Sequence, residues 1–187
     1  MALSRINSSM IGAGDVSNTE HAYLNSVTSN VQTQIDGAGV TDVKFLAYNS
    51  STDSNVTGDE TDYTVVCDTE VFDTGADYNN STGVFTAPET GKYLLSGAVF
   101  YQGATSSVTW ARLTLSTSNG DYYADTHAYN NQGVSNANGS VVLSAVVDMD
   151  ASDTLTMKFN AKGSTKIVDV FGNATHAYTF LSGALLA

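Results

Sequence analysis

Cysteine, proline and basic residues are all scarce in this chain of 187 residues. There is one cysteine, one proline, and seven lysines and arginines against nineteen aspartates and glutamates. A single cysteine excludes an intrachain disulfide. The formal net charge of −12 argues against nucleic acid and anionic membranes as partners, because an acidic surface is repelled by both.

Long apolar runs are also missing. No run reaches the roughly 18 residues that a membrane-spanning helix needs, so we predict no membrane insertion. The opening residues Met-Ala-Leu-Ser-Arg-Ile lack the apolar core of a secretory signal, and we expect no such signal. The sequence contains no P-loop, no dinucleotide-binding fingerprint, no paired zinc ligands and no G-x-S-x-G elbow. We therefore expect that the protein is not an enzyme.

The residues that are abundant favour β-structure. Tyrosine, threonine, valine and serine are frequent, while charged residues make up only 14% of the chain. Such a composition is typical of β-rich proteins with polar loops. Cys67 lies in the apolar run Val65-Val66-Cys67, which favours a small buried hydrophobe over a reactive thiol.

The most informative stretch runs from Gly83 to Gln102 and contains the single proline, Pro88. Residues 84–87 form a short β-type run, and Pro-Glu-Thr-Gly follows as a turn. After the turn, apolar residues occupy both faces of an alternating run, which indicates a strand covered on both sides. We predict a β-hairpin here, at the centre of an all-β domain.

The remainder of the chain from Val43 alternates β-type runs with polar loops, giving about eight to ten strands in all. The other predicted strands are Phe45–Tyr48, Tyr63–Phe72, Val108–Leu115, Ser140–Val147, Thr154–Asn160, Ile167–Phe171 and Ala177–Leu186. Ser140–Val147 and Thr154–Asn160 are interpreted as a pair of strands, and residues 49–62 and 116–138 as polar excursions. This organisation fits a two-sheet jelly roll.

Two parts of the sequence resemble the C1q/tumour-necrosis-factor-like family. The residues that match its central signature, roughly an aromatic followed by Gly-x-Phe-x-x-Pro-x-x-Gly-x-Tyr, are Tyr78, Gly83, Phe85, Pro88, Gly91 and Tyr93. Phe180–Leu186 resembles the closing strand of the family. The resemblance covers about residues 43–187 and implies a C1q/TNF-like jelly-roll β-sandwich that forms homotrimers. The strand faces we expect to meet in the trimer bear Tyr93, Val99, Tyr101 and Phe180.

The first part of the chain is predicted to be an extended anchoring arm at residues 1–16 and a short helix at residues 17–37. Ser17 and Glu20 form a capping box at the start of that helix. The apolar residues that would bind a partner are Ile6, Met10 and Ile11 in the arm and Leu24, Val27, Val31 and Ile35 in the helix. The helix either packs on its own domain or assembles with copies of itself as a stalk. The first 36 residues resemble N-terminal segments of tailed-phage fibre and virion proteins.

Two polar regions are candidate sites. Exposed aromatics beside amides suit the recognition of a host-surface glycan or protein, although the same side chains could pack on the sandwich. The candidate recognition residues are Tyr122, Tyr123, His127 and Tyr129.

Asp148, Asp150 and Asp153 are candidate calcium ligands. The lack of an EF-hand glycine and glutamate favours a plain solvated turn instead. No other cofactor is predicted. Where the family commonly has Gly-Asp in this turn, the chain has Ser152-Asp153.

We therefore interpret the chain as a non-enzymatic structural protein of a tailed-bacteriophage virion. In this interpretation a trimeric knob, made in the host cytoplasm, sits on the virion surface and is anchored to capsid or tail proteins by its N-terminus. Both a capsid decoration (cement) protein and a short tail-fibre or receptor-binding protein fit this description. The alternative is a free, soluble, C1q-like carbohydrate-binding lectin or adhesin.

Overall fold

The computed structural model describes residues 42–127 and 137–186. The chain divides into two units, Met1–Val40 and Thr41–Ala187, and every described residue belongs to the second. The predicted arm and helix lie outside the described residues and remain predictions. The same holds for the site residues Ile6, Met10, Ile11, Leu24, Val27, Val31, Ile35 and Tyr129.

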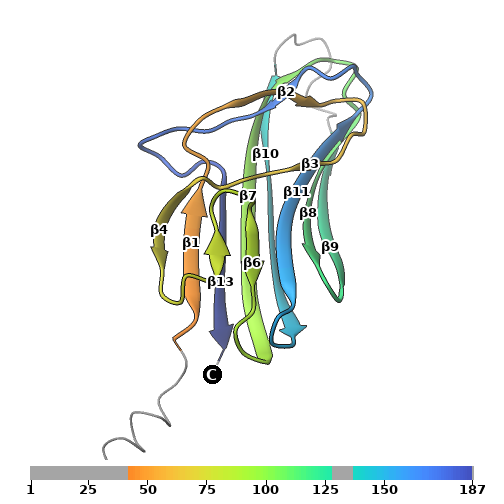
Figure 1. Cartoon of the computed structure of the whole chain (residues 1–187). Helices are drawn as coiled ribbons and strands as arrows, with labels where there is room; N and C mark the ends of the chain where they lie inside the picture. The colour runs from red at the N-terminus through yellow and green to blue at the C-terminus, as the bar shows by residue number, and fades with distance from the viewer. Residues whose placement is uncertain (1–41, 128–136, 187) are drawn as a thin grey trace, which may run out of the picture. The chain divides into compact units, whose positions relative to one another are not determined.

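The described residues form two antiparallel sheets that pack face to face, with no helix among them (Figure 1). Sheet A consists of β2 (Asp53–Thr57), β12 (Val168–Val170), β7 (Gly91–Ala104), β13 (Phe180–Leu186), β1 (Lys44–Tyr48) and β4 (Thr69–Asp73), with β10 (Ala137–Met149) paired to β7. Sheet B consists of β5 (Tyr78–Asn79), β6 (Val84–Thr86), β11 (Thr154–Lys162), β8 (Trp110–Thr117) and β9 (Gly120–His127), with β3 (Tyr63–Thr64) paired to β11. The predicted all-β, two-sheet fold is confirmed.

An aromatic stack fills one part of the core between the sheets. The ring of Phe45 on β1 stacks on Tyr78 at a centroid distance of 5.1 Å and on Phe85 at 4.6 Å. Phe85 in turn meets the edge of Tyr93, 5.8 Å away on β7. The aromatic residues of the sequence signature are therefore core residues that join the two sheets.

Cys67 is fully buried, as predicted. Its backbone N–H donates to the Tyr78 hydroxyl at 3.1 Å, and that hydroxyl donates to the Cys67 carbonyl at 3.2 Å. Burial raises the pKa of the Cys67 thiol to about 12. The thiol is therefore protonated near neutral pH, which suits the structural role and not the reactive one.

The predicted central hairpin is wrong. Strand β6 pairs with β5 and β11 in sheet B, whereas β7 pairs with β10, β12 and β13 in sheet A. The turn at Pro88 carries the chain from one sheet to the other. The backbone of Ala87 bonds with Ser152 and Asp153 instead of with β7, at 2.7 and 2.8 Å.

The predicted pairing of Ser140–Val147 with Thr154–Asn160 is also wrong, for the same reason. Strand β10 belongs to sheet A and β11 to sheet B, so the turn at residues 150–153 is a second crossing between the sheets. The bonds of Ala87 place the two crossings side by side. Such crossings between stacked sheets are what distinguishes a jelly roll from a stack of hairpins.

Three further predictions of strand and loop need correction. Residues 63–72 are not one strand, because the chain leaves sheet B after Thr64 and enters sheet A at Thr69. The polar segment 49–62 contains β2, which pairs with β12. Residues 120–127, predicted as part of a surface excursion, form β9 and pair with β8 along its whole length.

Ser152, in the turn between β10 and β11, has a strained backbone. Its φ angle is 78°, in the left-handed region where glycine is unstrained and other residues are not. We expect Ser152→Gly to raise the free energy of unfolding by about 0.5 kcal/mol, since the released strain exceeds the added chain entropy of glycine. Urea denaturation of the variant and the native chain measures this difference in the free energy of unfolding. Ser140→Gly, in the extended backbone of β10, is the matched control and is expected to lower stability by a similar amount.

Candidate functional site

The outer face of sheet A carries three cross-strand rows of mainly apolar and hydroxyl side chains. The first row is Lys44, Ala184, Leu94 and Val146. The second is Phe72, Leu46, Ser182, Ser96 and Ser144. The third is Tyr48, Phe180, Ala98 and Val142. We call these thirteen residues, on five adjacent strands, the outer A face.

Charge is almost absent from the outer A face. Among the described residues that make it up, Lys44 at one corner is the one charged side chain, and it pairs with Asp42 at 2.7 Å. Several apolar members are nevertheless open to solvent. Leu94 is 44% exposed, Val142 59% and Val146 57%. In a chain with net charge −12, an apolar patch of this extent with a single charged side chain at its corner indicates a surface that another protein surface covers.

The centre of the outer A face is shallowly hollowed. A depression of about 250 Å³ is lined mainly by Phe72, Leu94, Ser96, Gly183 and Ala184. Beside it, the hydroxyls of Ser96 and Ser144 bond to each other at 2.8 Å. The hydroxyls are thus paired within the face, which lowers the cost of removing them from water.

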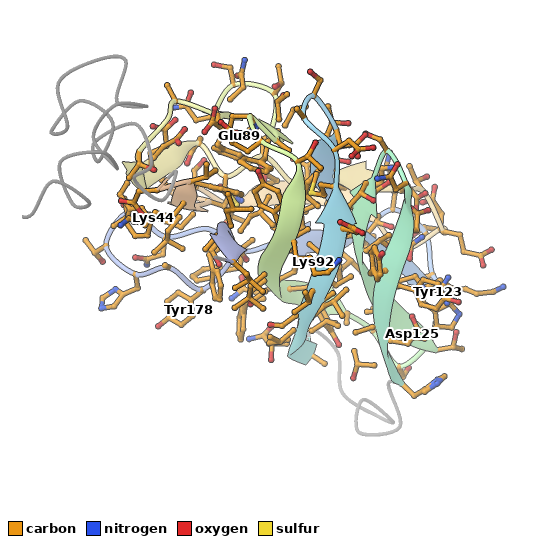
Figure 2. The ribbon with its side chains drawn as sticks, turned by 90° about the horizontal axis from the view of Figure 1, so that it is seen from below. Lys44, Glu89, Lys92, Tyr123, Asp125 and Tyr178 are labelled. Atoms are coloured by element: carbon orange, nitrogen blue, oxygen red, sulfur yellow. The ribbon has the colours of Figure 1, made fainter. Side chains whose placement is uncertain are left out.

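An aromatic cluster extends this apolar surface at one end. The rings of Phe100, Phe171 and Tyr178 lie within 5.3–5.7 Å of one another, centroid to centroid. His176 lies 6.0 Å from Tyr178. Figure 2 shows Tyr178 on the same side of the molecule as Lys44, consistent with one continuous surface.

Strand β10 forms an edge of sheet A next to the outer A face. Within the described residues its one partner strand is β7, so the other side of its backbone pairs with no strand. That side is not fully open, because β10 also lies close to β8 and β9 of sheet B, and Asn119 donates to the Asp148 carbonyl at 3.3 Å. Natural proteins rarely leave a long strand edge open to water, because its free N–H and C=O groups invite pairing. The exposed Val142 and Val146 lie on this strand, so the edge and the outer A face are continuous.

The strand faces we expected to meet in a trimer need correction. Tyr93, Val99 and Tyr101 point into the core between the sheets and are almost completely buried. Only Phe180 of the four lies on the outer A face. Both alternating sets along Gly91–Ala104 carry apolar residues, so the sequence leaves open which set faces outward. The structure shows that the set with Tyr93, Val99 and Tyr101 faces the core.

The outer face of sheet B carries charged and aromatic side chains in contact with each other. Arg112 on β8 lies over two rings, 5.0 Å from the centroid of Trp110 and 4.5 Å from that of Tyr123. Its Nε and Nη2 groups donate to the two oxygens of Asp125, at 2.6 and 2.8 Å. This bond lowers the pKa of Asp125 and raises that of Arg112. We call Trp110, Arg112, Tyr123 and Asp125 the Arg112 cluster.

The structure separates the sequence-predicted recognition residues. Tyr123 and His127 share the outer side of β9 with Asp125, because alternate residues of a strand face the same way. Tyr122 points to the other side, where it lines a cleft of about 410 Å³ with Asn119, Asp148 and Asp150 among others. Sequence reasoning missed Arg112 and treated Trp110 only as part of a strand.

The candidate calcium ligands do not converge on one point. Asp148 pairs with Lys92 at 3.2 Å, Asp150 accepts from the Thr90 hydroxyl at 3.4 Å, and Asp153 accepts from Asn119 at 2.6 Å. Across residues 42–127 and 137–186, no three or more His, Cys, Asp and Glu side chains are grouped to hold a metal ion. Nor does any helix there have the length and apolar character to cross a membrane.

Comparison with solved structures shows the same fold. The globular domain of zebrafish complement 1qA aligns with 78% of this chain and 98% of its own, at 15% identity and a TM-score of 0.53. Murine APRIL aligns at 15% identity and a TM-score of 0.54, over 78% of this chain and all of its own. Eiger TNF from S. frugiperda gives 13% identity and a TM-score of 0.56, over 78% of this chain and 93% of its own.

These likenesses identify a C1q/TNF-like jelly roll. They concern the fold alone, because identities of 13–15% carry no information on partners. No protein-family model matches the chain, and no curated protein matches it.

Proposed function

We propose that the protein is a non-enzymatic homotrimeric module that assembles through its outer A face. The observation that carries this proposal is the exposed, mainly apolar outer A face, in which Leu94, Val142 and Val146 are open to solvent and Lys44 is the one charged member. Full burial of a valine or leucine side chain contributes about 1.5–3 kcal/mol. Several such residues in each of three copies supply the driving force for a closed assembly.

A three-fold arrangement agrees with the position of the unpaired β10 edge. The edge lies beside the outer A face, so the two surfaces point in different directions on one molecule. An edge that packs against the face of the next copy makes a head-to-tail contact, and such contacts form a ring when the rotation between copies closes. The C1q/TNF-like fold, in which the sequence resemblance implies trimers, favours three copies.

We further propose that this trimer is a structural knob on the surface of a tailed-phage virion. Support comes from the first 36 residues, which resemble N-terminal segments of phage fibre and virion proteins. In this role the arm and helix bind capsid or tail proteins, and the jelly roll faces the medium. A capsid decoration protein would spread its arms over neighbouring shell subunits, whereas a short tail fibre would gather its three arms into one socket and bind the host receptor.

A free lectin or adhesin is the second candidate. The observation that favours it is the solvent-exposed Tyr123 in the Arg112 cluster, because an exposed aromatic beside polar groups suits ligand recognition. This candidate also uses the outer A face for assembly. It differs in requiring no virion partner.

Deletion of residues 1–36 separates the two roles. We expect light scattering to show the full chain at three times its monomer mass of 19.6 kDa, and the shortened chain at three times its own smaller monomer mass. Only the full chain should be found on purified phage particles by mass spectrometry, since the deleted segment is the anchor. Cryo-electron microscopy of those particles then distinguishes head from tail.

Each outcome of this experiment tests a different part of the proposal. A monomeric full chain would overturn assembly through the outer A face. A shortened chain that still incorporates into particles would overturn anchoring by the N-terminus. Absence of the full chain from particles would overturn the virion role and favour the free recognition module.

A further inference from the structure

We propose that the Arg112 cluster, on the outer face of sheet B, is a binding site for a neutral sugar ring. In this site Tyr123 provides the stacking surface, while Asp125 and Arg112 bind hydroxyls. The inference goes beyond the assembly role and does not depend on it. A failure here would leave the trimer and the virion anchor untouched.

The cluster is assembled by the register of two strands. Arg112 lies directly opposite Asp125 in the β8–β9 pair, and Tyr123 is the diagonal neighbour opposite Thr114. Trp110 precedes Arg112 by two residues and so lies on the same side of β8. Figure 2 shows Tyr123 and Asp125 side by side on β9, at the other end of the view from Lys44 and Tyr178.

The side chains of the cluster hold one another in place. Asp125 binds the guanidinium of Arg112 with two bonds, which fixes both the position and the plane of that group. The fixed guanidinium then lies over the rings of Trp110 and Tyr123. A surface that is already ordered loses little entropy when a ligand binds, which favours recognition of small, rigid molecules.

The groups that remain available match the chemistry of a pyranose. The Tyr123 side chain is 60% exposed, so much of its ring can still contact a ligand. Arg112 uses its Nε and one Nη of five N–H donors on Asp125, and each Asp125 oxygen retains a free lone pair. A pyranose presents an apolar C–H face and a rim of hydroxyls that both donate and accept. Arg112 covers one side of the Tyr123 ring at 4.5 Å, so the apolar face of the pyranose packs against the part of the ring that Arg112 leaves exposed. From there its hydroxyls bind the solvent-facing side of the ion pair.

The charge of the site favours a neutral sugar over an anionic one. The positive charge of Arg112 is compensated by Asp125 at 2.6 Å, and Asp121 lies on the same side of β9. On the neighbouring β11, Lys162 is paired with Glu60 at 2.7 Å, whereas Lys158 donates to the neutral Ser116 hydroxyl at 3.1 Å and keeps its positive charge. The chain as a whole carries −12, which repels carboxylated and sulfated sugars.

The single tryptophan of the chain makes the test direct, because Trp110 lies inside the proposed site. The full-length protein is titrated with the methyl glycosides of glucose, galactose, mannose and N-acetylglucosamine, and with methyl glucuronide as the anionic probe. We expect a saturable change in Trp110 fluorescence with at least one neutral glycoside, and weaker or no binding of the glucuronide. Tyr123→Ala is expected to weaken binding at least about tenfold.

Tyr122→Ala is the matched control, since this neighbouring tyrosine faces away from the Arg112 cluster. We expect it to bind the glycosides like the native chain, with circular dichroism confirming that both variants are folded. The proposal is overturned if no neutral glycoside changes the fluorescence, or if Tyr123→Ala binds as tightly as the native chain. Tighter binding of the glucuronide overturns it as well, because the site would then recognise an anion.

Discussion

A Val142→Glu variant is expected to be monomeric at concentrations where the native chain is a trimer. Val142 is 59% exposed on β10, so the isolated fold tolerates a carboxylate there. Its row on the outer A face continues through Ala98 and Phe180 and contains no basic residue. Covering an unpaired carboxylate costs several kcal/mol, and a closed trimer incurs that cost three times. Light scattering over a concentration series measures the change.

Tyr123→Glu is the control for this variant. Tyr123 is equally exposed, at 60%, but lies on the outer face of sheet B. We expect this variant to remain trimeric, because the proposed assembly leaves that face uncovered. Thermal melting should show both variants folded. A Val142→Glu protein that stays trimeric, or a Tyr123→Glu protein that dissociates, would place the interface elsewhere.

The fold class could be predicted from local signals in the sequence. Period-two alternation, turn residues and the signature around Pro88 are all local, and they indicated a β-sandwich of the type observed. The same signals could not say which strand pairs with which. A strand that pairs with its sequence neighbour and one that crosses to the other sheet have the same alternation. Hence β6 and β7 were predicted as a hairpin although they lie in different sheets.

Local sequence signals likewise could not show which face of each strand points to the core and which to solvent. In β7 both alternating sets are apolar, since one set fills the core and the other forms part of the outer A face. Tyr93 and Leu94 are adjacent in sequence, yet the first is fully buried and the second 44% exposed. Only the packing of sheet B on one side of sheet A decides between them. The sequence alone therefore does not reveal the exposed apolar surface, because the core-facing residues of the same strand are apolar as well.

The recognition role of Tyr123 and His127 stays a prediction. The structure adds that the two residues lie on the same side of β9. Arg112 was missed because its partner Asp125 is thirteen residues away and was assigned to a loop. The alternation of Asp121, Tyr123, Asp125 and His127 with Tyr122, Ala124 and Thr126 was the available signal for a strand. Once β9 is a strand, its register with β8 brings the four members of the Arg112 cluster together.

The largest loss of stability is expected from Phe85→Ala. Phe85 is almost completely buried, and it joins the sheets by contacting Phe45 of sheet A at 4.6 Å and Tyr93 at 5.8 Å. Removing a buried phenylalanine costs about 3–5 kcal/mol, through lost burial and the cavity that remains. Urea unfolding should be followed at one protein concentration, because assembly adds to apparent stability. Tyr123→Ala, which removes an exposed ring, should change the free energy of unfolding by less than about 1 kcal/mol. Equal losses in the two variants would mean that the signature aromatics do not form the centre of the core.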